Sequence, residues 1–204
     1  MRVLETGRLV LRPFAWTDFS AFHALAYADP AVAPWWTGRV RPADEVRRGF
    51  ARKVAQPPGT PGWLAITRRD TGALAGGMGL QRWLPDEDTS WLLPEDPADA
   101  PSRDPAVLEV ELAYALGRTH WGHGYATEAG HAVVAYAFGE LGVARILSPI
   151  NSANARSIRL AQRLGCRIRR NLHPRPSPFH ATPGVLAVLT RAEWAAASDS
   201  PASG

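Results

Sequence analysis

The most constraining feature of the sequence is a strand-like segment that runs through a glycine turn straight into a helix. Residues 107–116 are mostly apolar and predict a buried strand. Gly122 and Gly124 follow, and an alanine-rich helix is predicted over residues 125–139. The N–H groups of a helix's first turn have no partner within the helix, and the helix dipole adds partial positive charge there. The segment therefore predicts an anion-binding turn at the end of the strongest strand.

Strands and helices alternate along the rest of the chain, which is typical of α/β or α+β domains with a mixed sheet. A hairpin is expected with its turn at Asp70, Thr71 and Gly72, and an aromatic-rich loop is expected over residues 31–38. The other expected strands are residues 3–12, 62–68, 73–81, 143–150, 166–170 and 184–190, and the other helices are expected to begin at Thr17–Asp18, Pro42 and Asn154.

The length of 204 residues favours one domain, which we predict over residues 1–197. Residues 198–204 are predicted to be a disordered tail. Residues 84–105 are rich in acidic residues and proline without periodicity, so they are predicted to form a mobile acidic insertion. The single cysteine, Cys166, excludes an internal disulfide framework and is interpreted as a core residue.

Composition narrows the cellular context. No apolar run is long enough to span a membrane, and the first residues lack the apolar stretch of a secretory signal, so a cytoplasmic protein with no membrane partner is expected. The formal net charge is +4, and Lys53 is the only lysine among 23 basic residues. No recognisable nucleic-acid module is present, so no nucleic-acid partner is expected. The arginines can equally serve the phosphates of a coenzyme.

The glycine turn has a structural interpretation and a functional one. Glycines spaced i, i+2 can simply permit a tight passage from strand to helix, or they can let a pyrophosphate approach the backbone closely. A P-loop is excluded because no Lys-Ser/Thr pair follows the glycines. A dinucleotide fingerprint is excluded because Thr127 stands where its third glycine would be.

Three motifs in the same order resemble those of one enzyme superfamily. The sequence WGHGYATEA, residues 121–129, resembles motif A of the GNAT acetyltransferases, in the branch of the RimJ/RimL-type ribosomal-protein N-terminal acetyltransferases. The opening ETGRLVLRPF resembles the entry strand of this branch, and the N-x-x-S-x-R-L-x-x-x-L-G segment from Asn154 to Gly165 resembles its next helix. The closing LTRAEW is also typical. Thr119 departs from the superfamily signature, which has Gln or Arg at that position.

The resemblance implies a GNAT fold, with a mixed central sheet of about seven strands, a splayed central parallel pair and about four flanking helices. It implies acetyl-CoA as the cosubstrate and no metal. Backbone groups of Tyr114 and Leu116 would bind the pantetheine, and Arg118 or arginines of residues 154–170 would meet a remaining phosphate. The implied pyrophosphate donors are the backbone N–H groups of Gly122, His123, Gly124, Tyr125 and Ala126.

Two strand glutamates are the candidates for the catalytic base. Glu111 lies in an otherwise apolar strand, where burial favours the neutral carboxyl and suits it to accept a proton near neutrality. Glu109, two residues earlier, is the reserve candidate and is also placed among the acceptor-binding residues. The structural alternative is that one or both form ion pairs only.

The general acid is less clearly marked. Many members of the superfamily carry a tyrosine seven residues after the asparagine of the N-x-x-x helix, but Ala161 stands there in this chain. The resemblance instead offers Ser157, whose hydroxyl could hydrogen-bond the thiol sulfur. Asn154 is expected to cap the helix and is a candidate contact for the pantetheine, with a purely capping role as the alternative.

The acceptor side is marked by aromatic and acidic residues. Trp35 and Trp36 are expected either in the core or in the wall of the acceptor pocket, and the acidic insertion is either a solvated loop or an attractant for a cationic amine. The histidines at 120, 123 and 131 lack the spacing of a helical zinc motif, so no metal site is expected.

The sequence therefore favours an N-acetyltransferase that moves the acetyl group of acetyl-CoA directly to a primary amine, either a protein N-terminal α-amine or a small-molecule amine. The alternative is a non-catalytic acyl-CoA-binding or sensor module, which Ala161 and Thr119 keep open. Members of this branch are often dimers, so a homodimer is a further expectation.

Overall fold

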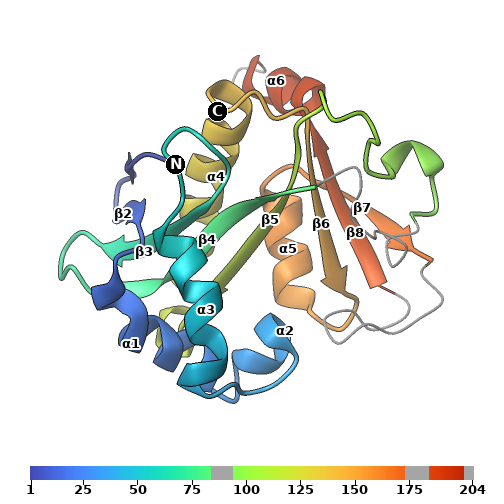
Figure 1. The fold of residues 1–204 in the computed structure, drawn as a ribbon. Helices are drawn as coiled ribbons and strands as arrows, with labels where there is room; N and C mark the ends of the chain where they lie inside the picture. The colour runs from blue at the N-terminus through green and yellow to red at the C-terminus, as the bar shows by residue number, and fades with distance from the viewer. Residues whose placement is uncertain (84–93, 173–183, 200–204) are drawn as a thin grey trace. The chain divides into compact units, whose positions relative to one another are not determined.

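The computed structural model describes residues 1–83, 94–172 and 184–199 (Figure 1). Its main elements are β1 (Leu4–Glu5), β2 (Leu9–Pro13), α1 (Phe19–Phe22), the π-helical turn η2 (His23–Ala28), α2 (Ala33–Thr37), α3 (Ala43–Val54), β3 (Trp63–Arg68), β4 (Leu74–Arg82), β5 (Glu109–Leu116), α4 (Tyr125–Gly139), β6 (Arg145–Asn151), α5 (Ala155–Arg163), β7 (Arg167–Asn171), β8 (Gly184–Thr190) and α6 (Arg191–Asp199). The strand order is β1-β2-β3-β4-β5-β6-β8-β7, with β5 and β6 parallel. This mixed sheet confirms the predicted fold class.

The chain divides into two compact units. The first comprises residues 1–81 and 112–136, and the second comprises residues 82–111 and 137–204. The last five residues of β5 therefore belong to the first unit, and its first three residues belong to the second. The single domain predicted over residues 1–197 stays a prediction.

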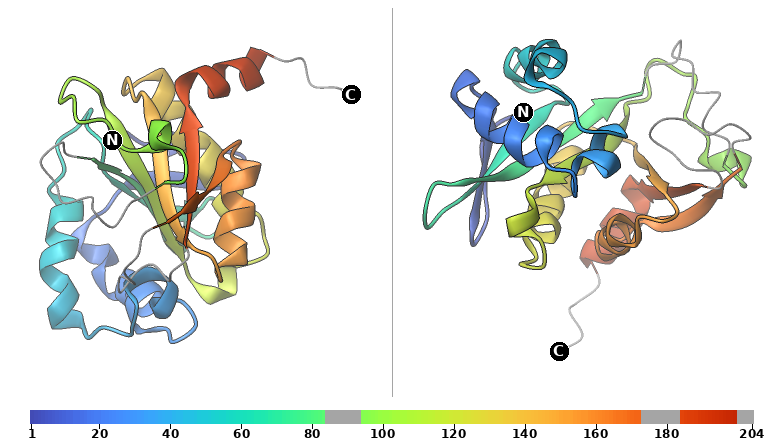
Figure 2. Two further views of the ribbon diagram at one scale, coloured as in Figure 1. Left: turned by 90° about the vertical axis from the view of Figure 1, so that its right-hand side faces the viewer. Right: turned by 90° about the horizontal axis from the view of Figure 1, so that it is seen from below.

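In the first unit, β2, β3 and β4 are antiparallel neighbours. Figures 1 and 2 show α1 and α3 on one face of these strands and α4 on the other. Successive strand residues point to opposite faces, so Leu64 and Ile66 of β3 share one face while Trp63 and Ala65 share the other. All four side chains are buried, which explains why β3 is apolar from Trp63 to Ile66 and shows no polar–apolar alternation there.

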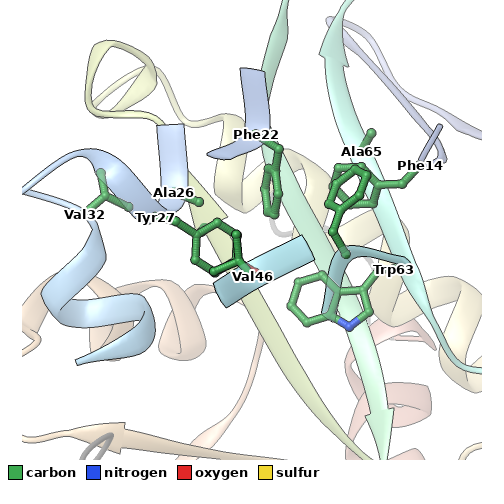
Figure 3. Packing of buried hydrophobic residues seen from close by; sticks show 10 residues of the cluster. Phe14, Phe22, Ala26, Tyr27, Val32, Val46, Trp63 and Ala65 are labelled. Atoms are coloured by element: carbon green, nitrogen blue, oxygen red, sulfur yellow. The ribbon is translucent and has the colours of Figure 1, made fainter. Parts of the chain in front are cut away.

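An aromatic core fills the face of the sheet that carries Trp63 and Ala65. Phe14 lies with its ring centroid 4.8 Å from that of Phe22 and 5.3 Å from that of Phe50. Figure 3 shows Phe14 and Phe22 together with Tyr27 of η2, Val46 of α3 and Trp63 of β3 in the same cluster. Burial of each such ring stabilises the fold by roughly 1.5–3 kcal/mol. The cluster includes Ala115, so it packs the first unit against the part of β5 that leads to the glycine turn.

The only lysine of the chain packs against this aromatic core. Lys53 Nζ lies 3.3 Å from the centroid of the Trp63 ring and 5.7 Å from that of Trp36. Burial, with a smaller contribution from neighbouring Arg52, lowers the pKa of Lys53 from its ordinary value of 10.5 to about 7. The cation–π contact acts in the opposite direction, because it favours the charged form.

Substitution of Lys53 is expected to change how stability depends on pH. Between pH 7 and 10.5 the unfolded chain binds a proton that the folded chain has released, so this group makes the folded state more stable as pH rises through that window. In Lys53→Met that rise in stability disappears, and the free energy of unfolding of the variant exceeds that of the wild type most below pH 7. Urea unfolding at pH 6 and pH 9 measures this, with Lys53→Arg as the permanently charged control. Parallel wild-type and Lys53→Met profiles would contradict the assignment.

The second unit contains the first residues of β5 with β6, β8 and β7. Glu109 and Val110 pair in parallel with Arg145 and Ile146, and β8 pairs antiparallel with both β6 and β7. A second apolar cluster joins Trp83 to side chains of β6 and β8, namely Leu147, Leu186 and Val188. Helix α5 contacts β7 and β8, and α6 contacts β8.

Residues 94–105, the second half of the predicted acidic insertion, are anchored to this unit. The buried carboxylate of Asp99 lies 3.3 Å from both Arg167 and Arg169. The guanidinium of Arg145 donates to the carbonyl oxygens of Ala98 and Ala100, each at 2.6 Å. These contacts join residues 98–100 to the second unit. Residues 84–93 lie outside the described residues, and the mobility of the insertion stays a prediction.

Several local predictions are confirmed, and others are wrong. The hairpin turn at Gly72, with φ +68°, and helix α4 over residues 125–139 agree with the sequence. The expected strand over residues 3–12 is instead a small hairpin, β1–β2, because the Thr6 N–H bonds the Leu9 carbonyl across a turn. The expected loop over residues 31–38 contains α2.

Two expectations at helix ends also need correction. Asp18 does not cap α1, because its carboxylate accepts from the Ala15 N–H and pairs with Arg12. The predicted tail overlaps α6, which extends to Asp199, and residues 200–204 lie outside the described residues. Among the described helices, none is both long and apolar enough to cross a membrane.

Candidate functional site

The backbone of β5 directs alternate residues to its two sides. The Gly117 N–H donates to the Ala75 carbonyl of β4 at 3.0 Å. Because the N–H and C=O groups of one strand residue point the same way and alternate along the strand, the backbone groups of Leu112, Tyr114 and Leu116 point away from β4. These include the two residues predicted to bind pantetheine. Their contact with a cofactor stays a prediction.

Strand β4 approaches β5 closely at this place. A Cβ atom at Gly76 would lie 2.2 Å from the Ala115 carbonyl oxygen and 2.8 Å from the Leu116 Cα. Glycine is therefore the residue that β4 can place there without moving β5. The indole Nε1 of Trp121 donates to the Leu116 carbonyl at 2.9 Å and ties the following turn to the strand end.

The turn between β5 and α4 has the backbone form of an anion-binding nest. Gly122 and Gly124 have φ values of +79° and +77°, whereas His123 between them has a negative φ. Such alternation curls successive N–H groups toward one side. A Cβ at Gly122 would meet nothing within 4 Å, so this glycine is required by its backbone conformation. The positive φ accounts for this glycine on structural grounds, and the same conformation provides the donors that the functional interpretation needs.

Basic side chains surround this turn. Partial burial lowers the pKa of His120, and the nearby charges of Arg68 and His123 lower it further. The ring of His123 stacks on Tyr125 with centroids 5.5 Å apart, and Arg118 is exposed. The lowered pKa leaves the His120 ring uncharged at neutral pH, so the positive charge near the turn comes from arginine side chains such as Arg68. Together with the directed N–H donors, this charge suits a phosphate ligand.

Arg8 belongs to the ETGRLVLRPF motif, but its contact with the glycine turn could not be read from the sequence. It lies in the β1–β2 turn, and its Nη1 donates to the His123 carbonyl at 2.8 Å. Its Nε donates to Glu128, in the first turn of α4, at 2.6 Å. The Thr-Gly pair before Arg8 was the available signal, because it breaks the strand and presents this side chain at a turn.

The structure places the two glutamates of β5 in different surroundings. Glu109 is 4% exposed, and its Oε1 accepts from Arg145 at 2.6 and 2.9 Å. Its Oε2 accepts from the Ser102 N–H at 2.6 Å. Both oxygens are thus engaged in a structural network, which favours the ion-pair alternative for Glu109 over a role as base or acceptor contact. Glu111 is half-buried.

Helix α5 begins as the sequence predicted. The Asn154 side chain accepts from the Ser157 N–H at 3.2 Å, which confirms its capping role. Gly165 follows the helix with φ +88°, as a C-terminal glycine should. Ala161 is buried. The predicted contacts of Asn154 and Ser157 with a cofactor stay predictions.

Three further residues are placed by the structure. Trp36 packs against the aromatic core, whereas Trp35, its neighbour in α2, is 50% exposed. Trp36 therefore has the core contacts of the first interpretation, and a place for either tryptophan in a pocket wall stays a prediction. Burial, followed by the charge of Glu193, raises the pKa of Cys166 to about 12. Its thiol is thus protonated at neutral pH, as expected of a packing residue.

Comparisons with known proteins agree with this geometry. The acetyltransferase (GNAT) domain family matches residues 8–167. The uncharacterized protein YkkB of Bacillus subtilis is 26% identical over 79% of this chain and 83% of its own length. A GNAT-family acetyltransferase from Bacillus anthracis shares the fold, with a TM-score of 0.72 at 16% identity over 93% of this chain and 99% of its own. RimL, a ribosomal L7/L12 α-N-protein acetyltransferase solved with coenzyme A, has a TM-score of 0.69 at 13% identity over 93% of this chain and 98% of its own.

Proposed function

The chain belongs to the acetyltransferase (GNAT) family, and we propose from this premise that it transfers the acetyl group of acetyl-CoA directly to a primary amine. Members of this family are acyl-CoA-dependent transferases, so acetyl-CoA is the cosubstrate that the family indicates. The finer proposal is an acceptor in the class of protein N-terminal α-amines or small-molecule amines, as in the RimJ/RimL-type branch.

The observation that carries the proposal is the conformation of the turn between β5 and α4. Two glycines with positive φ present N–H groups at the start of a fifteen-residue helix, and a helix N-terminus of this kind favours a pyrophosphate. The backbone groups of Tyr114 and the Leu116 N–H point away from β4 and support the proposed pairing with an extended pantetheine chain, whereas the Leu116 carbonyl already accepts from Trp121. Gly122, His123, Gly124, Tyr125 and Ala126 are the proposed donors to the pyrophosphate.

The reaction has three requirements. The acceptor must lose a proton to become a neutral amine, its nitrogen must attack the thioester carbonyl carbon, and the carbon–sulfur bond must break as the thiolate leaves. We assign the first proton to Glu111, through a water molecule, and a hydrogen bond to the departing sulfur to Ser157. The products are the acetylated amine and CoA, with the thiolate protonated on release. Correct positioning of the two reactants supplies much of the acceleration in direct transfer, which is compatible with Ala161 at the usual tyrosine position.

Substitution of Glu111 tests the assignment of the base. In Glu111→Gln the carboxylate is replaced by an amide that cannot accept a proton, so kcat should fall by roughly 10²–10⁴-fold while the affinity for acetyl-CoA changes little. The measurement is thiol release from acetyl-CoA over a range of pH. Glu45→Gln, which removes an exposed carboxylate paired with Arg39, is the matched control. Turnover equal to that of the wild type at every pH would exclude Glu111 as the base.

The proposed function itself is tested by titration of the protein with acetyl-CoA in a calorimeter, with a free-thiol assay over a panel of amines and N-terminal peptides. Binding together with amine-dependent thiol release supports the acetyltransferase and names its acceptor class. Binding without release on any acceptor supports the non-catalytic acyl-CoA-binding module, for which the buried Ala161 is the specific observation. The absence of binding would overturn both.

A further inference from the structure

A cluster of hydrogen bonds joins the β1–β2 hairpin to the glycine turn and to helix α4. The Glu128 carboxylate accepts at Oε1 from the Thr6 hydroxyl, at 2.5 Å, and from the Arg8 N–H, at 2.7 Å. Its Oε2 accepts from Arg8 Nε at 2.6 Å. The same guanidinium then reaches the His123 carbonyl through Nη1, at 2.8 Å. We call these four residues, Thr6, Arg8, His123 and Glu128, the hairpin clamp.

The clamp fixes the orientation of one peptide group in the turn. The His123 carbonyl and the Gly124 N–H belong to the same planar trans peptide, so they point in opposite directions. Because Arg8 binds the carbonyl, the Gly124 N–H is directed to the side of the turn away from Arg8. A charged donor on the carbonyl also polarises the peptide and makes its N–H a stronger donor.

The clamp acts where the chain would otherwise be least restrained. Glycines on both sides of His123 adopt positive φ, and glycine has more conformations available than any other residue. Without side-chain contacts, the turn would have to be ordered when a ligand binds, at a cost in conformational entropy. Arg8 contacts the residues on both sides of Gly124. Its Nη1 binds the His123 carbonyl, and its guanidinium carbon lies 5.0 Å from the centroid of the Tyr125 ring.

Glu128 holds the Arg8 side chain in place. Its side chain is 17% exposed, whereas that of Arg8 is 54% exposed. Partial burial alone would raise the pKa of Glu128, but the hydrogen bonds from Thr6 and Arg8 outweigh it and hold the pKa below its ordinary value. Glu128 is therefore ionised at neutral pH and can orient the guanidinium.

We propose that Arg8, oriented by Glu128, is a positioning residue that aims the Gly124 N–H at the pyrophosphate of the cosubstrate. The inference rests on the proposed function, since it assumes that the turn binds the pyrophosphate of acetyl-CoA. It adds a residue near the N-terminus, 115 positions from His123, to the residues that determine the affinity for the cosubstrate. Arg8 acts through the turn, so its effect depends on a ligand that carries the pyrophosphate.

The test compares CoA with pantetheine, which lacks the phosphates. In Arg8→Lys the charge beside Glu128 remains, but the planar fork that bonds Glu128 and His123 together is lost. Calorimetric titration should show CoA binding about tenfold more weakly than to the wild type, while the affinity for pantetheine, measured by NMR titration, stays the same. Arg69→Lys is the matched control, because Arg69 binds Glu5 and the Thr6 carbonyl of the same hairpin; it should leave both affinities unchanged.

Glu128→Gln provides a second variant if Arg8→Lys folds poorly. Its amide can still accept from Thr6 and from the Arg8 N–H, but it no longer holds the guanidinium as an ion pair, so CoA affinity should again fall while pantetheine affinity does not. If the variants lost affinity for CoA and pantetheine equally, the clamp would have only a general structural role and the inference would be overturned. Variants that bound CoA as tightly as the wild type would overturn it as well. Failure of the wild type itself to bind CoA would instead overturn the proposed function.

Discussion

Gly122→Ala is expected to lose CoA affinity by roughly 10–100-fold, the equivalent of one charge-assisted hydrogen bond of about 1.5–3 kcal/mol. Alanine at a φ of +79° is strained by about 1–2 kcal/mol. The turn can relieve this strain by rotating its peptides, and the N–H groups then no longer converge. Calorimetric titration with CoA measures the loss.

The chain offers a closely matched control for this substitution. Gly59 also has a positive φ, +73°, and a Cβ there would likewise meet nothing within 4 Å. Gly59→Ala should therefore show the same loss of stability in urea unfolding but retain wild-type CoA affinity. If the two alanine variants bound CoA equally well, the turn between β5 and α4 would not be the pyrophosphate site.

Arg145→Met is expected to lower the free energy of unfolding by about 3–5 kcal/mol. Its guanidinium is the partner of the buried Glu109 carboxylate and also donates to the carbonyls of Ala98 and Ala100. The substitution leaves a buried negative charge and two carbonyl oxygens without these donors. Chemical denaturation at neutral pH measures the change.

Two comparisons establish whether burial causes the effect. Arg39→Met removes a guanidinium from an exposed pair with Glu45 and should cost less than about 1 kcal/mol. The double variant Glu109→Leu/Arg145→Met removes both charges and should recover part of the stability lost in the single variant. A single variant as stable as Arg39→Met would show that the Glu109–Arg145 pair is not a significant source of stability.

The predictable parts of this protein are those that local physics controls. Helix α4 and the cap of α5 follow from apolar periodicity and from a side chain that bonds an N–H three residues away. The hairpin at Gly72 follows from a turn that needs positive φ. The aromatic segment over residues 31–38 was expected to be a loop, yet one short helix forms there, with Trp36 packed on the aromatic core.

The features of the candidate site also fall into those set by nearby residues and those that depend on distant ones. The sequence by itself determined the glycine turn, the strand before it and the helix after it, because each depends on residues close together in the chain. It could not show that Glu109 is buried in an ion pair, since its partner Arg145 lies 36 positions away. Nor could it separate Trp36 in the core from Trp35 at the surface, or find Arg8 beside Glu128, 120 positions distant. These assignments needed the tertiary structure, because the folded chain alone determines which distant residues become neighbours of a charge or a ring.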